Sequence, residues 1–475
     1  MQLTLGEIAS ALGSSCRASD RVARGYSIDS RTLSPGELFF AVRGRRTDGH
    51  LFVEAAFAAG AVGAVVERAY FASQPPERAP ALIPVDDTNQ ALQVLARAVR
   101  LRWGRQVIGI TGSTGKTTTK EMTAAILSRR YGVLKSPGNL NNLFGLPLSL
   151  LALGPEHEVA VVELAMSAAG EIARLARIAE VDIGVVTNVG PAHLEFFDSV
   201  EAIARAKREL IENLNPAGCA VLNHDDARVR RFREVFNGRV VTFGLTEGAD
   251  FRALDLRPRH GIGTLFRVVG FKLDAEFSLP LPGTYNVENA VAAIAASSLF
   301  EVPVRDLQQA LASFENLHQR SEILTLPGEL LVINDSYNSN PLAMERALEA
   351  LAGWPDVRRK IVVAGEMLEL GRTSPELHYA VGQKCARLGV DWLLAVQGEA
   401  QSLLRGALDA GLDPQRGKFF PSAEEAGKFC RELVRPGDLV LLKGSRGVHL
   451  ETVLKLLQER AGSNHPTVDP RPTSR

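Results

Sequence analysis

The sequence predicts an α/β protein with three domains: a small N-terminal α/β domain, a central domain with a mostly parallel sheet, and a C-terminal α/β domain. Two observations lead to this prediction. Apolar runs with the length of strands alternate with helical stretches along most of the 475 residues, an order typical of parallel sheets covered by helices. One apolar run, residues 107–110, leads through a loop rich in glycine and threonine into a helical stretch, residues 121–127.

Residues 1–103 are predicted to form the N-terminal domain. The stretch 74–80 is rich in proline and predicts a loop, and the other elements follow from short apolar runs and alanine-rich stretches. The predicted strands are residues 37–42 and 64–66, and the predicted helices are residues 52–61 and 89–101.

Residues 104–318 are predicted to form the central domain, whose first strand precedes the glycine-rich loop. Apolar and polar residues alternate between residues 265 and 281, which favours an antiparallel meander. An alanine-rich helix is predicted at residues 287–299. Further strands are predicted at residues 159–162, 183–187, 220–222 and 240–243.

Residues 319–460 are predicted to form a Rossmann-like C-terminal domain, because strands and helices alternate there regularly. Its predicted strands are residues 330–333, 360–364, 392–396 and 439–442, and its predicted helices lie near residues 344–351, 376–388 and 423–434. Residues 461–475 are rich in proline, serine and threonine and predict a disordered tail.

The composition argues against several classes of protein. Lysine plus arginine and aspartate plus glutamate both total 54, so the basic excess of a nucleic-acid-binding protein is missing. Cys16, Cys219, Cys385 and Cys430 lie far apart without metal-ligand spacing, which favours reduced core residues of a cytoplasmic protein. The N-terminus does not resemble a signal peptide, and no apolar run has the length of a membrane span.

The loop after the first strand of the central domain has the composition of a phosphate-binding loop. Gly112 and Gly115 allow backbone amides to face an anion at the N-terminus of the next helix. Lys116 supplies a positive charge for the terminal phosphates, and Thr117 supplies a hydroxyl for Mg²⁺. Ile110 departs from the usual pattern, which has a glycine there, and an ordinary turn is the alternative. A Gly-Lys-Thr-Thr run directly after an apolar strand favours a nucleoside triphosphate site in a P-loop ATPase-like domain.

Three further residues are candidates for chemistry, and each has an alternative interpretation. Glu163 directly follows a predicted strand, where an acid beside a phosphate loop can hold Mg²⁺; the alternative is a solvated carboxylate. His193 lies in a loop after another strand, where histidine is more often a surface or packing residue. Lys207 lies in a charged helical run and, taken alone, is one cation on a helix face.

These residues belong to a larger set of separated motifs that occur in a specific order. Through this set the sequence resembles the Mur ligase family along nearly its full length. Members of this family are ATP-dependent amino-acid and peptide ligases of peptidoglycan precursor synthesis. The motifs are residues 29–31, 36–41, 48–50, 111–118, 138–142, 163–164, 188–195, 206–207, 282–286, 289–290, 335–338 and 443–446.

The resemblance implies catalytic roles for the matching residues. Lys116 is expected to contact the terminal phosphates of ATP, and Thr117 with Glu163 to hold one Mg²⁺. His193 and Lys207 are expected to help place a second Mg²⁺. In the family the lysine that matches Lys207 is thought to be carbamylated, which converts an ammonium into an oxygen ligand. Carbamylation needs a neutral amine, so the pKa of this lysine must first be lowered.

The resemblance also implies two binding sites. The expected nucleotide site comprises Gly112, Ser113, Thr114, Gly115, Lys116, Thr117, Thr118, Asn286, Asn289, Arg320 and Asp335. The expected substrate site comprises Ser30, Arg31, Asp48, Gly49, His50, Asn139, Asn141, Asn142, Asn338, Lys443 and Arg446. The members in the first domain are expected to hold a uridine diphosphate group. Asn338, Lys443 and Arg446, with Asn340, are candidates for the acceptor.

The branch of the family that matches best implies a specific reaction. Its members join D-alanyl-D-alanine to UDP-N-acetylmuramoyl-tripeptide through an acyl phosphate made with ATP and Mg²⁺. Closure of the third domain on the central domain is expected to keep water from the acyl phosphate. The resemblance therefore predicts a cytoplasmic enzyme without membrane insertion, and we expect a monomer.

Two segments depart from the family pattern. Ala165, Ser167 and Ala168 stand where related ligases commonly have glycine, asparagine and histidine. Gln319 precedes Arg320, whereas the matching arginine usually follows a glycine.

Three alternatives stay open at this point. A ligase that adds the third residue to the UDP-linked dipeptide shares residues 29–31, but the sequence has no Asp-Asn-Pro-Arg motif. A folylpolyglutamate synthetase would leave the first domain unexplained. A non-catalytic ATP-binding switch is disfavoured because the four candidate catalytic residues are present.

Overall fold

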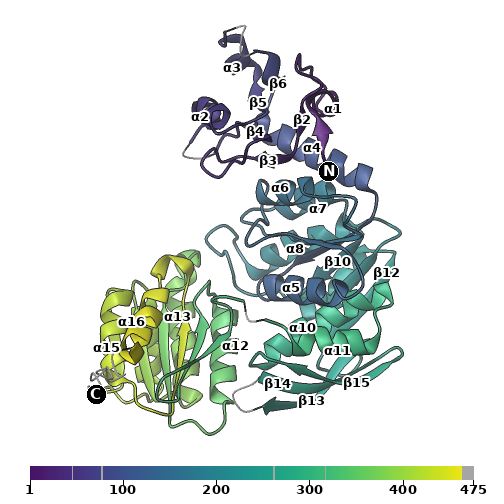
Figure 1. Cartoon of the computed structure of the whole chain (residues 1–475). Coiled ribbons are helices and arrows are strands. Elements are labelled where there is room, and N and C mark those ends of the chain that lie inside the picture. The colour runs from purple at the N-terminus through teal and green to yellow at the C-terminus, as the bar shows by residue number, and fades with distance from the viewer. Residues whose placement is uncertain (45–46, 76–78, 260–262, 316, 463–475) are drawn as a thin grey trace, which may run out of the picture.

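The computed structural model describes residues 1–44, 47–75, 79–259, 263–315 and 317–462. Three large sheets divide it into an N-terminal, a central and a C-terminal part, which follow one another from purple to yellow in Figure 1. Each part combines strands with helices, so the predicted α/β class with three domains is confirmed.

The N-terminal part is built on a four-stranded parallel sheet in the order β3-β4-β5-β6, and it also contains the antiparallel pair β1-β2. The helix predicted at residues 52–61 is shorter in the structure, because Gly60 follows its end with a left-handed φ of 95°. The elements are β1 (Leu3–Thr4), α1 (Leu5–Ala11), β2 (Val22–Ala23), β3 (Gly25–Ser27), β4 (Glu37–Phe40), α2 (Val53–Ala58), β5 (Gly63–Glu67), α3 (Arg68–Ala72), β6 (Leu82–Val85) and α4 (Thr88–Trp103).

The central part holds a nine-stranded sheet in the order β15-β14-β13-β12-β11-β10-β7-β9-β8. From β8 to β13 in this order, which includes β7, all neighbouring strands pair in parallel. The pairs β13-β14 and β14-β15 are antiparallel, as the alternating pattern predicted. Its strands are β7 (Gln106–Thr111), β8 (Val133–Lys135), β9 (Val159–Glu163), β10 (Ile183–Val186), β11 (Cys219–Asn223), β12 (Arg239–Gly244), β13 (Phe251–Arg259), β14 (Gly263–Gly270) and β15 (Leu273–Leu279). Its helices are α5 (Lys116–Leu127), α6 (Gly145–Leu151), α7 (Glu171–Ala179), α8 (Val200–Glu212), α9 (Ala227–Arg230), α10 (Thr284–Ser297) and α11 (Val304–Ala312).

The C-terminal part holds a six-stranded sheet in the order β16-β17-β21-β18-β19-β20. The four predicted strands pair in parallel as expected, and the additional strand β16 pairs antiparallel with β17 at one edge. Neither edge strand is predictable from a local pattern, because β16 and β20 are only half-buried and lack a long apolar run. The elements are β16 (Glu322–Leu326), β17 (Leu330–Asp335), α12 (Pro341–Ala352), β18 (Arg359–Gly365), α13 (Ser374–Arg387), β19 (Trp392–Val396), α14 (Ala400–Asp409), β20 (Gly417–Phe420), α15 (Ala423–Leu433), β21 (Asp438–Lys443) and α16 (Glu451–Gly462).

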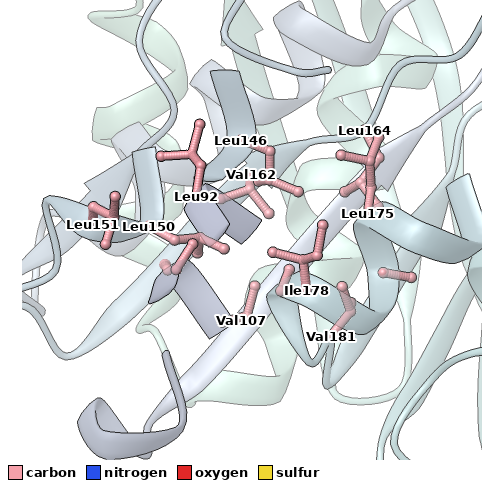
Figure 2. Packing of buried hydrophobic residues seen from close by; sticks show 14 of the residues in the cluster. Leu92, Val107, Leu146, Leu150, Leu151, Val162, Leu164, Leu175, Ile178 and Val181 are labelled. Atoms are coloured by element: carbon pink, nitrogen blue, oxygen red, sulfur yellow. The ribbon is translucent and has the colours of Figure 1, made fainter. Parts of the chain in front are cut away.

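One apolar core is shared by the N-terminal and central parts. Leu92 of α4 belongs to the same buried cluster as Leu146 and Leu150 of α6 and Leu175 of α7. Figure 2 shows these side chains gathered in one cluster with Val162 of β9. The C-terminal part instead has two buried clusters of its own, one on each face of its sheet. The first two parts are therefore joined by hydrophobic packing.

Several smaller expectations can be compared with the structure. Cys219, Cys385 and Cys430 are buried free thiols as expected, but Cys16 is only half-buried, so its assignment to the core is wrong. The predicted loop at residues 74–80 lies partly, and the predicted disordered tail almost wholly, outside the described residues. Within the parts of the chain that the structure describes, no helix combines the length and apolar character needed to span a membrane.

Candidate active site

The phosphate loop lies at the end of β7, between that strand and the N-terminus of α5. Gly115 caps α5 with a left-handed φ of 80°, and a Cβ atom there would lie 2.2 Å from Oδ1 of Asn289. A Cβ on Gly112 would lie 1.8 Å from Oγ1 of Thr187. Only glycine fits at both positions, because the loop backbone packs closely against Asn289 and Thr187.

Lys116 is the first residue of α5, and its ammonium is directed back into the loop. Its Nζ donates to the carbonyl oxygen of Gly112 at 2.8 Å. Burial lowers the pKa of Lys116, the nearby Glu163 carboxylate opposes that shift, and Arg320 of the third part adds to it. Lys116 therefore lies near Glu163 of the central sheet and Arg320 of the third part. A bound anion would balance the positive charges of Lys116 and Arg320.

Glu163 ends β9 and is almost completely buried. One of its carboxylate oxygens, Oε2, accepts a hydrogen bond of 2.7 Å from the Thr117 hydroxyl. The other, Oε1, accepts a hydrogen bond of 2.9 Å from the Asn141 amide. The structure thus brings together the two residues predicted to hold one Mg²⁺, and their hydroxyl and carboxylate oxygens are ligands that this ion prefers. A solvated strand-end carboxylate, the alternative for Glu163, is wrong.

Lys207 lies on the inner face of α8 and only 2% of its surface is exposed. The interpretation as a cation on an exposed helix face is therefore wrong. Burial lowers the pKa of Lys207 well below its usual value, and the neighbouring Lys116 ammonium adds to that shift. Both effects act toward the neutral amine of Lys207, which is the state that carbamylation requires.

His193 lies in the loop after β10 and has a left-handed φ of 58°. Its Nδ1 lies 2.6 Å from Oε2 of Glu369, a residue of the third part that the sequence analysis did not single out. The interpretation of His193 as an ordinary surface residue does not account for this contact.

These residues line a cleft of about 430 Å³ between the central and third parts. The predicted residues that the cleft brings together are Ser113, Thr114, Gly115, Lys116, Thr117, Thr118, Asn139, Asn141, Glu163, His193, Asn286, Asn289, Arg320, Asp335, Asn338, Asn340 and Lys443. Residues that also line it but were missed are Tyr285, Ser321, Tyr337, Ser339, Ala343, Arg346 and Glu369. Glu369 follows the end of β18, and acids after parallel strands could have been searched for in the sequence.

Other predicted residues lie outside the lining of this cleft. Asn142 lies just before α6, and its Oδ1 accepts from the backbone N–H of Gly145 at 2.9 Å. Arg446 donates from Nη1 to Oε1 of Gln319 at 2.6 Å. Gly112 and Lys207 are also not among the lining residues. Lys207 nevertheless lies close enough to Lys116 for the Lys116 ammonium to lower the pKa of Lys207.

The third part contributes an ion pair and an aromatic contact to the cleft. The buried ammonium of Lys443 pairs with Asp335 and also donates to the carbonyl oxygen of Asn338 at 3.2 Å. The guanidinium of Arg320 lies 4.1 Å from the centroid of the Tyr337 ring. These contacts hold charged groups at the cleft before any ligand is considered.

The first-domain motifs lie away from this cleft. Arg31 pairs with Asp29 at 2.7 Å on the surface, and the Arg31 hydrogen bond lowers the pKa of Asp29 to about 2. The ring of His50 is buried, with Nδ1 donating to Asp48 at 2.6 Å and Nε2 accepting from the backbone N–H of Glu67 at 2.9 Å. A Cβ on the preceding glycine would lie 2.6 Å from a backbone oxygen. The motif at residues 48–50 therefore supports the local backbone, because both nitrogens of the histidine have partners inside the protein.

A cluster of classical metal ligands is absent from the described residues, where no three or more His, Cys, Asp or Glu side chains meet. The donors near the phosphate loop are Glu163, His193 and the Thr117 hydroxyl. A carbamate on Lys207 would add oxygen donors close to Lys116. The described donors fit a hard cation that takes few protein ligands and shares the oxygens of a nucleotide.

Comparisons with known proteins agree with this geometry. Three domain models match in chain order: the Mur ligase family catalytic domain at residues 23–100, the Mur ligase middle domain at residues 110–297, and the Mur ligase glutamate ligase domain at residues 319–446. The UDP-N-acetylmuramoyl-tripeptide--D-alanyl-D-alanine ligase of Bacillus subtilis is 36% identical over 438 residues, which are 92% of this chain and 94% of that protein. The chain belongs to the Mur ligase family.

Solved structures of Mur ligases have the same fold as this chain. MurF from Acinetobacter baumannii has a TM-score of 0.87 and 31% identity, with 97% of this chain and 99% of that chain covered. The MurF ligase from Thermotoga maritima, solved in complex with ADP, has a TM-score of 0.82 and 30% identity, with 93% and 99% covered. The expected Mur ligase fold, with its three domains, is confirmed.

Proposed function

We propose that this Mur ligase joins D-alanyl-D-alanine to UDP-N-acetylmuramoyl-tripeptide and uses ATP to do so. The observation that carries the proposal is the near full-length match to ligases of that name, at 36% identity for the relative from Bacillus subtilis. The cleft supports it, because Lys116, Glu163, His193 and the buried Lys207 lie at or beside one phosphate loop.

In the proposed reaction, a carboxylate oxygen of the tripeptide attacks the γ-phosphorus of ATP, and the bond to ADP breaks. Lys116 neutralises charge on the transferring phosphoryl group, and Arg320 approaches from the third part. The amine of D-alanyl-D-alanine then attacks the acyl phosphate, loses a proton, and phosphate leaves as the peptide bond forms. Water would destroy the acyl phosphate, so the two sides of the cleft must close during this sequence.

We propose Thr117, Glu163, His193 and a carbamylated Lys207 as the residues that hold Mg²⁺. The hydroxyl and carboxylate of Thr117 and Glu163 already meet at 2.7 Å. A neutral Lys207 amine can attack CO₂, forming an N–C bond and losing a proton. When bound, Mg²⁺ would supply positive charge to the phosphate oxygens and polarise them.

We further propose that Ser30 and Arg31 contact the uridine diphosphate group and that Asp48, Gly49 and His50 fix the backbone beside them. Arg31 is largely exposed, so it is free to exchange Asp29 for a substrate phosphate. For the acceptor, Asn338 and Lys443 remain candidates because they line the cleft, together with Asn139 and Asn141 on the central side. The domain limits at residues 103, 318 and 460, the monomeric state and the cytoplasmic location stay predictions.

A coupled assay of ADP release tests the proposal. The purified chain is given UDP-muramyl dipeptide or tripeptide, each with single amino acids or with D-alanyl-D-alanine. We expect rapid ADP release only with tripeptide plus D-alanyl-D-alanine, and none with a Lys116→Ala variant used as the control. Joining of free lysine or diaminopimelate to the dipeptide, with D-alanyl-D-alanine ignored, would identify a third-residue ligase instead. ATP binding without ADP release in any mixture would indicate a non-catalytic switch.

A further inference from the structure

Two loops from different parts of the chain meet beside the cleft. The loop after β10 carries His193, and the loop after β18 carries Glu369. Oε2 of Glu369 lies 2.6 Å from Nδ1 of His193, and the carbonyl oxygen of Glu369 accepts from the backbone N–H of Glu195 at 3.0 Å. A side-chain and a main-chain hydrogen bond thus cross between the same two loops.

The loop that carries Glu369 is fixed to the third part on both sides of that residue. Met367 and Leu370 are buried in its apolar core. The backbone N–H of Met367 donates to Nε2 of His378 at 2.9 Å, and that of Leu368 donates to the Ser445 hydroxyl at 2.9 Å. Glu369 must therefore move with the third part as a unit and can reach His193 only when that part is docked.

The contact determines which nitrogen of His193 carries the proton. A carboxylate only accepts hydrogen bonds, so Nδ1 carries a proton, and in the neutral imidazole Nε2 is then the nitrogen with the free lone pair. His193 lines the same cleft as Glu163 and Thr117. A histidine that binds a metal through one nitrogen commonly donates the other N–H to a carboxylate, which fixes the ring and its tautomer.

We propose that Glu369 is a positioning residue that fixes the tautomer and orientation of His193, so that the metal site is complete only when the third part is docked. This inference rests on the proposed function in one respect, namely that His193 binds the metal. The same contact has a reciprocal consequence. If docking strengthens metal binding through His193, then bound metal must favour docking by the same factor.

Metal binding to the full-length chain gives the first test. Mn²⁺ is titrated in the presence of a non-hydrolysable ATP analogue, and free Mn²⁺ is followed by electron paramagnetic resonance. We expect Glu369→Ala to raise the dissociation constant for Mn²⁺ about 10- to 100-fold, and Glu369→Gln to raise it less because an amide oxygen still accepts from Nδ1. Asp198→Asn, an equal charge change at an exposed site five residues from His193, should match wild type and serves as the control.

The tautomer itself gives the second test, without any metal. Nitrogen NMR of ¹⁵N-histidine-labelled protein, with the His193 signal identified by its loss in His193→Gln, should show a protonated Nδ1 in wild type. In Glu369→Ala the proton should shift toward Nε2. Neither test contains an acceptor substrate, so a different acceptor in the ligase assay would leave both expectations unchanged. Unaltered Mn²⁺ affinity in Glu369→Ala, no Mn²⁺ binding by wild type, or a wild-type His193 protonated at Nε2 would each overturn the inference.

Discussion

The two interfaces of the central domain are built from different kinds of contact. Towards the N-terminal domain, Leu92 and its neighbours on α4 belong to one apolar core with helices α6 and α7. Towards the third domain, the contacts that line or border the cleft are mainly polar. Tyr285 and Ser321 share a hydrogen bond of 2.8 Å, Glu288 and Arg346 form an ion pair of 3.0 Å, and His193 meets Glu369.

The difference indicates which domain is free to move. Separating a shared apolar core exposes its surface to water at about 25 cal/mol for each Å². Hydrogen bonds across a cleft can instead be exchanged for hydrogen bonds to water, at a net cost of about 1 kcal/mol each. We therefore expect the N-terminal and central domains to behave as one body, which would keep the proposed uridine diphosphate site fixed relative to the phosphate loop. The third domain can then open to admit ligands and close over them.

The first prediction concerns the polar interface and has the largest expected effect. Lys207→Ala should reduce turnover about 10³-fold or more, because a buried group beside the phosphate loop loses its proposed carbamate charge. Steady-state ADP release measures this loss, and short carboxylic acids that restore an oxygen ligand should rescue part of it. Arg205→Ala, at an exposed position of the same helix, is the control and should stay active. Full activity of the Lys207 variant would refute a catalytic role.

The second prediction concerns the apolar interface, where stability and not chemistry should suffer. Leu92→Ala should lower the free energy of unfolding by about 2–5 kcal/mol, because it leaves a cavity in the shared core. Turnover per folded molecule should stay near wild type. Chemical denaturation followed by circular dichroism measures the loss, and Val94→Ala, at a partly exposed position of the same helix, is the matched control. Separate unfolding of the N-terminal and central domains in wild type would contradict the view that they form one body.

Most of the central domain and its phosphate loop could be predicted from sequence, because the signals are local. A fully buried parallel strand such as β9 has a continuous apolar run in its sequence, and the phosphate loop has a recognisable spacing of glycines. The half-buried edge strand β16 has no such run, and it was missed. Local pattern therefore predicts strands that are buried on both faces and fails at the half-buried edges of the C-terminal sheet.

The candidate site was predicted only where each residue matched a family motif. The burial of Lys207 could not be derived from its charged surroundings, because the side that a helical residue buries depends on what packs against it. The contact of His193 with Glu369 joins residues 176 positions apart. Nothing local specifies such a pair, since it depends on how two separately folded domains dock.

Residues 317–321 lie directly before β16, the first strand of the third domain, and this segment, which we call the hinge, contains a departure from the family pattern. Gln319 stands where the family usually has glycine, and its φ is 61°, a left-handed conformation that glycine adopts without cost. For other residues the cost is about 1–2 kcal/mol. The Gln319 side chain accepts a hydrogen bond of 2.6 Å from Arg446, and its carbonyl oxygen accepts one of 3.1 Å from the Tyr337 backbone. These contacts offset the cost and hold Arg320 over the cleft.

The third prediction follows from this hinge and has the smallest expected effect. Arg446→Ala should lower kcat/KM for ATP about tenfold, because the left-handed backbone at Gln319 loses a contact that holds it. Gln319→Gly should be nearly as active as wild type, since glycine needs no such contact. In a Gln319→Gly background, Arg446→Ala should then have no further effect, and a double-mutant cycle measures this coupling. If Arg446 instead binds the carboxylate of the acceptor, its loss would raise KM for D-alanyl-D-alanine equally in both backgrounds. That result would show that Arg446 binds the substrate and that its contact with Gln319 does not stabilise the left-handed backbone there.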